Sequence, residues 1–307
     1  MKYYSGGKMD FRCLRDNPNL TVIFDTDMCC DVDDVGALYL LLAASKKYGF
    51  RIGGIAVNVN SEREAAAVGA LLREAGMDIP VGVYDGENPE SGNRSAYVDF
   101  LAGRYGGVSG KMTAAELYAR VLDGAEDGAV AVVSVGFFNN LNAARRVDPA
   151  LFDRKVGTVV AMAGRFDGEV GFAEFNIREF PEDSREFIAS FGGEIIFGGF
   201  EIGYRVMTDL TGLPADSLIA EAYKIYTNGT MRRESWDPLT VDFAIAGECE
   251  SYALSERGVA RVLADLSVGF TPAEVGRHRY IILRRPYDEM SKHISDAVKD
   301  AYTRLAK

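Results

Sequence analysis

Short apolar runs alternate with longer amphipathic segments along most of the chain. Strand-like runs cover 20–24, 51–57, 79–83, 129–134, 156–162, 194–197 and 205–208. Helical segments cover 35–44, 62–74, 139–146 and 181–190. Continuous apolar runs are typical of strands buried on both faces, and strand–helix alternation favours a parallel sheet covered by helices. The sequence therefore predicts an α/β fold with a mostly parallel central sheet flanked by helices.

The remainder of the chain continues this pattern without a break. After Asp237 the sequence predicts a helix, a hairpin over 252–266, a strand over 280–283 and a terminal helix from Tyr287. No linker rich in Pro, Ser or Gly and no internal repeat divides the chain, so residues 1–307 are expected to form a single domain. Within it, residues 1–19 form an amino-terminal extension, and the polar, Gly-rich segment 85–110 leaves the sheet as a flap.

Composition and charge narrow the class of protein. The chain has 307 residues, is 48% hydrophobic, and carries 34 basic against 45 acidic residues, a net charge of −11. An acidic protein is a poor partner for nucleic acids and anionic membranes. No stretch approaches the ~20 apolar residues of a membrane span. His278 and His293 are the only histidines, which excludes a multi-histidine metal site, and 4 cysteines are too few for a secreted disulfide scaffold. A small-molecule ligand and a cytoplasmic location are expected.

An aspartate cluster follows the first strand. It contains Asp25, Asp27, Asp31, Asp33 and Asp34, between a predicted strand and a predicted helix. That turn lies at the carboxyl edge of a parallel sheet, where ligands bind. Crowded carboxylates raise one another's pKa unless a cation neutralises them, and hard oxygen donors favour Ca²⁺ or Mg²⁺ over zinc. Helix capping explains one or two of the aspartates in 31–34 and leaves Asp25 and Asp27 unexplained.

The intervening residues Cys29 and Cys30 have two interpretations. They are either soft metal ligands or small residues that fill the loop, and the second interpretation is favoured.

Two families place carboxylates in this way. The segment 22–27, with Asp25 and Asp27, resembles the start of haloacid dehalogenase-type phosphatases, in which the first aspartate is a nucleophile and the second an acid/base. Ser134 would supply that family's hydroxyl residue, but its lysine and second acidic pair do not follow in the required order. This resemblance implies a Mg²⁺-dependent phosphatase.

Four motifs in the correct chain order resemble the inosine–uridine type of nucleoside hydrolase. They are Asp25-Thr26-Asp27 with Asp33-Asp34, the strand and turn 132–141, Met162-Ala163-Gly164 followed by 173–177, and Ser235-Trp236-Asp237-Pro238. Together they span most of residues 20–285. The resemblance implies a single-domain protein that hydrolyses the N-glycosidic bond of a ribonucleoside to ribose and a free base, and that assembles as a homodimer or homotetramer.

The resemblance also implies a metal site and a catalytic base. Asp27, Asp34, Asp237 and the backbone carbonyl of Val135 would bind Ca²⁺, and Asp33 would be the general base. A carboxylate beside Ca²⁺ keeps a low pKa and faces a water that the ion acidifies.

The same correspondence names substrate contacts. Glu174 and Asn176 match the ribose-binding pair, Asn60 matches a further ribose-contacting asparagine, and Met162 and Glu169 match pocket-lining positions. Trp236 replaces the histidine that acts on the leaving base in many members. An indole there stacks on a purine, which gives a weak preference for purine ribosides.

This chain departs from the family pattern in the acidic loop. The turn between Asp27 and Asp33 is longer than usual, and Asp31, inside the added length, is a candidate extra metal ligand or base. Gly136-Phe137 stands where the family has Gly-Pro. These differences leave open a non-catalytic protein that binds ribose or a nucleoside through a metal.

Overall fold

One mixed sheet organises the described part of the chain, residues 11–89, 95–105 and 112–306 of this computed structural model. Its strands are β1 (Thr21–Thr26), β2 (Arg51–Val57), β3 (Val81–Val83), β4 (Val130–Ser134), β5 (Val156–Met162), β6 (Glu194–Gly198), β9 (Tyr252–Leu254), β10 (Gly258–Val262), β11 (Val268–Pro272) and β12 (His278–Leu283). The order is β11-β10-β12-β6-β5-β4-β1-β2-β3, and β9 pairs with β12. Two short strands, β7 (Met207–Asp209) and β8 (Arg232–Glu234), form a separate antiparallel pair.

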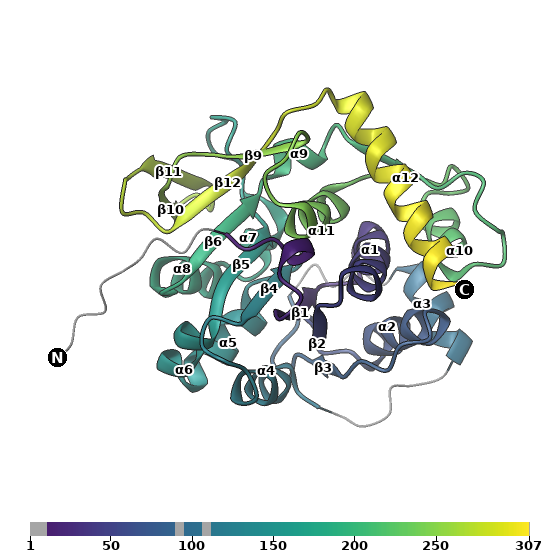
Figure 1. Cartoon of the computed structure of the whole chain (residues 1–307), viewed down its shortest axis with the longest axis horizontal. Coiled ribbons are helices and arrows are strands. Elements are labelled where there is room, and N and C mark those ends of the chain that lie inside the picture. Colours follow the sequence, from purple (N-terminus) through teal and green to yellow (C-terminus); the bar gives the residue numbers. More distant parts are fainter. Residues whose placement is uncertain (1–10, 90–94, 106–111, 307) are drawn as a thin grey trace.

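Helices cover both faces of this sheet (Figure 1). Those of more than one turn are α1 (Asp33–Tyr48), α2 (Glu62–Glu74), α3 (Ala96–Tyr105), α4 (Ala114–Asp123), α5 (Asn139–Val147), α6 (Pro149–Lys155), α8 (Pro181–Ser190), α10 (Leu218–Tyr226), α11 (Trp236–Ala246) and α12 (Tyr287–Leu305). The short ones are η1 (Leu14–Asp16), α7 (Phe175–Glu179) and α9 (Phe200–Gly203). The mostly parallel α/β fold predicted from the sequence is confirmed.

The hydrophobic core is divided between the two faces. On one face, apolar residues of α1, α2, α10, α11 and α12 pack on the sheet, and on the other those of α4, α5, α6 and α8 do so. Helix α1 lies between α11 and α12 in contact with both (Figure 1). Its buried positions run continuously from Asp33 to Ala44, so it is hydrophobic on all sides after its acidic first turn. Burial of such a helix requires elements on every side, which α11 and α12 supply.

The strand order creates a ligand-binding position at one edge. All pairings from β12 through β6, β5, β4, β1 and β2 to β3 are parallel. From β1 the chain adds strands on one side (β2, β3), and from β4 it adds them on the other (β5, β6). The connections that follow β1 and β4 therefore diverge and leave a crevice at the carboxyl ends of these two strands. Asp27 follows β1 and Val135 follows β4, which places both residues at this switch point.

Several elements differ from the sequence-based prediction. The hairpin predicted over 252–266 instead joins β10 to β11 over 258–272, while β9 pairs with β12. The turn forms where Leu266 adopts a positive φ of 65° and Asp265 accepts hydrogen bonds from Ser267, so the local polar contacts set the register. His278, the first residue of β12, is buried rather than exposed.

The predicted extension and flap are described only in part. Residues 1–10, 90–94 and 106–111 lie outside the described residues, and within the remainder η1 packs against α1 and α11, while 96–105 forms α3. Among the described residues, no helix is both long enough and apolar enough to span a membrane.

Candidate active site

A pocket of about 280 Å³ opens at the switch point. Loops after β1, β4 and β5, together with α7, α9, α10 and the start of α11, contribute its walls. The lining residues are Asp27, Cys30, Asp31, Asp33, Asp34, Val135, Met162, Glu174, Phe175, Asn176, Phe200, Tyr226, Arg233, Trp236 and Asp237. A larger, open depression of about 1500 Å³ lies at the opposite edge, beside the amino ends of β1, β2 and β3. Ligands of parallel α/β sheets bind at the carboxyl edge, so the smaller pocket is the candidate site.

Four aspartates are buried around this pocket. Asp27, Asp33, Asp34 and Asp237 are each at most 5% exposed, and carboxylate oxygens of the last three lie within 4.8 Å of one another. Burial raises the pKa of each carboxyl well above its usual range, and the negative neighbours raise it further. Holding such groups ionised requires a compensating positive charge. The residues present therefore fit a hard divalent cation.

Asp33 connects two distant segments of the chain. Its Oδ2 accepts hydrogen bonds from the backbone N–H of Trp236 at 3.0 Å and of Asp237 at 3.1 Å. Thr26 donates its hydroxyl to Oδ1 of the neighbouring Asp34. These contacts hold the loop between β1 and α1 against the start of α11. The structure thereby brings Asp237 to the aspartates of the first loop.

The loop after β4 approaches the acidic loop closely. A Cβ atom on Gly136 would lie only 2.5 Å from the backbone nitrogen of Asp27 and would also collide with Asn58, so only glycine fits there. The carbonyl of Val135, the residue before Gly136, accepts a hydrogen bond from Asn176 Nδ2 at 3.1 Å. Val135 lines the pocket, and its carbonyl oxygen has a second lone pair that can bind a ligand.

Glu174 and Asn176 are fixed by backbone contacts. Glu174 caps α7, with Oε1 accepting from Asn176 N–H at 2.9 Å and Oε2 from Gly164 N–H at 3.1 Å. Gly164 has a φ of +75°, a conformation that favours glycine. Burial raises the pKa of Glu174 to about 7. Asn176 also donates to the carbonyl of Met162 at 2.9 Å, so the two polar side chains and Met162 form one wall of the pocket.

Four aromatic side chains form a further part of the lining, here called the aromatic wall. Phe175, Phe200, Tyr226 and Trp236 all line the pocket. The indole of Trp236 stacks on Phe200 with 5.4 Å between ring centroids, and its Nε1 donates to the Phe200 carbonyl at 2.8 Å. A flat ligand group can stack against such a wall while its polar part faces the carboxylates.

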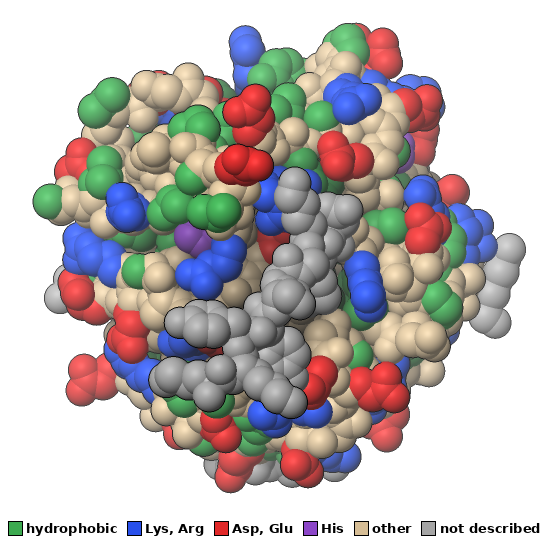
Figure 2. Space-filling model, turned by 60° about the vertical axis from the view of Figure 1, so that its left-hand side comes forward, with side chains coloured by type: hydrophobic (Ala, Val, Ile, Leu, Met, Phe, Trp, Pro, Cys, Tyr) green, Lys and Arg blue, Asp and Glu red, His purple; other side chains and the backbone are tan. Residues whose placement is uncertain are grey.

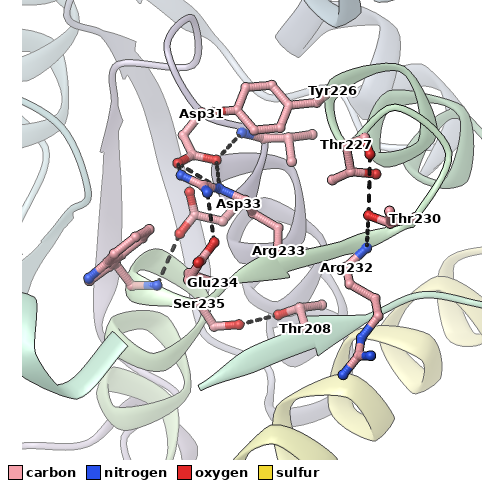
Figure 3. A network of polar contacts seen from close by, with 12 residues as sticks. Asp31, Asp33, Thr208, Tyr226, Thr227, Thr230, Arg232, Arg233, Glu234 and Ser235 are labelled. Atoms are coloured by element: carbon pink, nitrogen blue, oxygen red, sulfur yellow. Dashed lines mark hydrogen bonds and ion pairs between the residues drawn. The ribbon is translucent and has the colours of Figure 1, made fainter. Parts of the chain in front are cut away.

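Asp31 forms an ion pair with Arg233 inside the pocket (Figure 3). Arg233 Nε lies 2.8 Å from Asp31 Oδ1, and its Nη1 lies 2.6 Å from Oε2 of Glu234. The guanidinium carbon lies 5.4 Å from the Tyr226 ring centroid and 5.3 Å from that of Trp236. Arg233 is the one basic residue among the described residues of the lining.

Sequence reasoning missed Arg233, Tyr226, Phe200 and Phe175. No local pattern marks them, because they come from α7, α9, α10 and β8 and meet only in the folded chain. The spare length of the acidic loop was the available signal, since Asp31 reaches Arg233 from within it.

Two predicted substrate contacts lie elsewhere. Asn60 is exposed and donates Nδ2 to the Gly86 carbonyl at 2.9 Å. Glu169 is exposed and pairs with Arg165 at 2.8 Å. The structure does not bring either residue to the pocket lining.

Asp25 lies beneath the pocket in a buried polar network. Asn58 Nδ2 donates to its Oδ1 at 2.6 Å, and the Tyr118 hydroxyl donates to its Oδ2 at 2.9 Å. Burial raises the pKa of Asp25 to about 7, although these hydrogen bonds oppose the shift. Asp25 is fully buried and absent from the lining, so its contacts support the loop rather than a ligand.

Neither histidine reaches the site. His278 accepts a hydrogen bond from Ala260 N–H through Nδ1 at 2.8 Å, and His293 Nε2 lies 2.8 Å from Asp242 Oδ2 on the side of α12. On the face shown in Figure 2, basic and acidic side chains are interspersed among the described residues that are visible. That distribution differs from the continuous basic face of a nucleic-acid-binding protein.

The mostly parallel sheet and its pocket define an α/β protein whose switch point carries a cluster of carboxylates suited to a divalent cation. Within that class, the chain belongs to the family described as inosine-uridine preferring nucleoside hydrolases, whose model matches residues 22–269. It is accordingly an N-ribosyl hydrolase, a glycosidase that acts on nucleosides, and its family depends on a metal. This confirms the family and the enzyme class predicted from the sequence.

Solved structures share the fold over nearly the whole chain. A plant nucleoside hydrolase is 22% identical, with a TM-score of 0.68, covering 93% of this chain and 99% of the other. The inosine-uridine preferring nucleoside hydrolase from Bacillus anthracis is 18% identical, with a TM-score of 0.67 and coverages of 91% and 99%. The type III effector protein XopQ, complexed with adenosine diphosphate ribose, is 13% identical, with a TM-score of 0.73 and coverages of 92% and 94%. No curated protein sequence matches the chain.

Proposed function

We propose that the protein hydrolyses the N-glycosidic bond of a ribonucleoside in a Ca²⁺-dependent reaction, with purine ribosides preferred, to give ribose and a free base. The observation that supports this proposal is the composition of the 280 Å³ pocket, which combines four buried aspartates, two fixed polar residues and an aromatic wall. A ribose fits the polar side, and a base fits the aromatic side.

Asp27, Asp34, Asp237 and the carbonyl of Val135 would hold the cation. All four offer hard oxygen atoms, which favour Ca²⁺ or Mg²⁺ over zinc, and Ca²⁺ is the ion that the family resemblance implies. A bound divalent ion would lower the pKa of a water molecule and orient the ribose hydroxyls.

Asp33 would take the proton from the attacking water. Its Oδ2 is occupied by the two backbone N–H groups of α11, which orients the carboxylate and leaves Oδ1 for the proton. Asp31 is a less suitable base, because Arg233 binds both of its carboxylate oxygens and occupies the positions at which a water proton would be accepted.

Glu174 and Asn176 would bind the ribose hydroxyls. Glu174 Oε2 accepts hydrogen bonds from two backbone N–H groups, whereas Oε1 accepts only that of Asn176 and retains a lone pair for a hydroxyl donor. Met162 would contact the sugar from the same wall. Asn60 and Glu169, which do not line the pocket, have no part in this binding mode.

The aromatic wall would bind the base. Trp236 lies against Phe200 and beside Arg233, so a purine can extend the stack. Since neither histidine lines the pocket, proton donation to the leaving base by histidine is not part of the proposal.

A second candidate function is metal-dependent binding of ribose or a nucleoside without turnover. The complex of XopQ with adenosine diphosphate ribose favours it, because a protein with this fold has been solved with a ribose-containing ligand. A phosphatase mechanism is disfavoured, because its nucleophile would be Asp25, which is fully buried and hydrogen-bonded beneath the pocket.

The test is a panel of purine and pyrimidine ribosides incubated with and without a chelator, with reducing sugar measured as product. The proposal expects release of ribose that the chelator abolishes and Ca²⁺ restores. Asp33→Asn should retain Ca²⁺-dependent thermal stabilisation but lose turnover. Ca²⁺-dependent stabilisation by ribose without any base release would instead support the binding protein. Release of phosphate from phosphate esters alone would refute both.

We also propose a cytoplasmic, homo-oligomeric protein. The four cysteines are free thiols, which is compatible with a reducing compartment. Light scattering on the eluted protein would measure the number of subunits, and a mass of one chain would contradict this part of the proposal.

A further inference from the structure

The acidic loop contains two adjacent thiols that the proposed reaction does not use. The Sγ atoms of Cys29 and Cys30 lie 2.7 Å apart, on the same side of the turn after β1. Cys29 is buried, whereas Cys30 is partly exposed and lines the pocket. An ion that enters the pocket can therefore reach the pair.

A third ligand stands beside these thiols. Both sulfur atoms and a carboxylate oxygen of Asp27 lie within 4.8 Å of one another. This group is separate from the cluster of Asp33, Asp34 and Asp237, which contains only oxygen donors. Two sulfurs and one oxygen form a donor set that selects soft or borderline ions such as Zn²⁺ and Cd²⁺ over Ca²⁺.

We propose that Cys29, Cys30 and Asp27 form a second metal site, specific for thiophilic divalent cations. Each thiol would lose its proton to solvent on binding the ion, and the three residues would supply two sulfur donors and one oxygen donor. Because Asp27 is also a ligand in the proposed Ca²⁺ site, occupation of the thiol site withdraws a ligand from that site. The thiophilic ion thereby inhibits hydrolysis. The inhibition rests on the proposed function, whereas the binding of the ion does not.

A disulfide between the two cysteines is the competing explanation. Adjacent Cα atoms are ~3.8 Å apart across a trans peptide, which is shorter than the ~4.4–6.8 Å spanned by ordinary disulfides. A disulfide between neighbouring residues is therefore strained. Two thiolates that bind one ion need no sulfur–sulfur bond and avoid this strained ring. The local geometry favours the ion.

The binding test uses Cd²⁺, whose thiolate complexes absorb in the ultraviolet. Cys13→Ser/Cys249→Ser removes the other two cysteines, neither of which lines the pocket, and leaves only the vicinal pair. We expect this background variant, in Ca²⁺ buffer, to bind one Cd²⁺ with thiolate charge-transfer absorption. Adding Cys30→Ser, at the partly exposed position, should weaken binding by more than about tenfold, since even losing an outer-shell partner costs about 10–100-fold.

The two proposals fail in distinguishable ways. Absence of the charge-transfer band in the background variant, or an unchanged affinity after Cys30→Ser in a variant of unchanged melting temperature, would refute the thiophilic site. Finding no free thiol in the unfolded background variant would replace it with a disulfide. If ribosides are hydrolysed, Zn²⁺ should inhibit the background variant, excess Ca²⁺ should relieve the inhibition, and the Cys30→Ser variant should resist it. If no riboside is hydrolysed, the Cd²⁺ titration still decides the site.

Discussion

Arg233 binds both carboxylate oxygens of Asp31, although 202 residues separate them in sequence. Asp31 lies two residues before Asp33, and Arg233 lies four residues before Asp237. The ion pair therefore joins the two chain segments that carry the carboxylates of the pocket. It also places a positive charge among them, which reduces their mutual repulsion.

Replacing Arg233 with Met should destabilise the protein by about 1–3 kcal/mol, because Asp31 would lose its partner beside other buried carboxylates. Urea denaturation measures the change. Arg232→Met is a matched control, since Arg232 is 58% exposed and its nearest carboxylate, on Asp209, is 3.5 Å away. Equal losses in the two variants would show that the pocket ion pair has no special role.

Asp237→Asn should separate folding from cation binding. Removing one of the crowded carboxyl groups relieves repulsion, so the cation-free variant should melt at a higher temperature than the natural protein. The increase in melting temperature that Ca²⁺ produces should be lost, and hydrolysis with it. Asp300→Asn, an exposed change on α12, should leave both quantities unaltered. A Ca²⁺ response that survives Asp237→Asn would exclude this residue as a ligand.

The two histidines should give stability terms of opposite sign with pH. Burial lowers the pKa of His278 to about 4, below the ordinary value of 6.5. As the pH falls from about 6.5 towards 4, unfolded chains bind a proton that the folded state excludes, so stability decreases by up to about 3 kcal/mol. His278→Gln should reduce this loss, measured as the free energy of unfolding at about pH 7.5 and about pH 4.5.

His293 serves as the control with the reverse sign. Its hydrogen bond to Asp242 raises its pKa, so its contribution is complete below about pH 6.5 and disappears as the pH rises through the folded-state value. His293→Gln should therefore reduce the loss of stability that accompanies a rise in pH above about 6.5. It should not change the loss of stability at acidic pH that is assigned to His278. The assignment fails if both variants change stability over the same pH range.

Gly136→Ala should disrupt the contact between the loops after β1 and β4, on which the shape of the pocket depends. The new Cβ would lie 2.5 Å from the Asp27 nitrogen, so the β1 and β4 loops must separate. We expect the free energy of unfolding to fall by about 3 kcal/mol, the upper end of the usual range for overpacking. Cation binding should also be lost. Gly103→Ala, in α3 with nothing within 4 Å, should stabilise the protein by about 0.5–1 kcal/mol. Calorimetry on both variants decides, and a benign Gly136→Ala would contradict the close approach.

Trp236→Leu should lower kcat/KM for purine ribosides by about fivefold to tenfold, the effect of losing roughly 1 kcal/mol of stacking. Pyrimidine ribosides, with a smaller ring, should be affected less. Tyr204→Leu is the control, because Tyr204 also stacks on Phe200 but is 57% exposed and does not line the pocket. A uniform loss across all ribosides would argue against base stacking by the indole.

The sequence was sufficient to predict the sheet and the position of the acidic loop. Apolar runs followed directly by Asp27 or Val135 indicate strand ends, and parallel strands bring those ends to one edge. The interval between Asp237 and the first loop carries no local signal, so their proximity came from the family resemblance. The hydrogen bonds from α11 to Asp33 are its structural basis.

Two other features were not predicted correctly from the sequence. Helix α4 was missed although Thr113 and Glu116 form a capping box that is readable in sequence. In the turn after β2, Asn60 was singled out, whereas Asn58 two residues earlier is the buried residue that holds Asp25. Asn58 still lies against the end of β1, where its backbone N–H donates to the Thr26 carbonyl at 2.8 Å, whereas Asn60 lies past the sheet in an exposed bend.

The hydrogen bonds from Trp236 and Asp237 to Asp33 also have a consequence for biosynthesis. They join positions 203 and 204 residues apart. A ribosome therefore releases the acidic loop long before it releases the helix that closes over it. Until that helix is made, Asp33 lacks the two backbone donors that orient its carboxylate, so the pocket is complete only after the last third of the polypeptide docks.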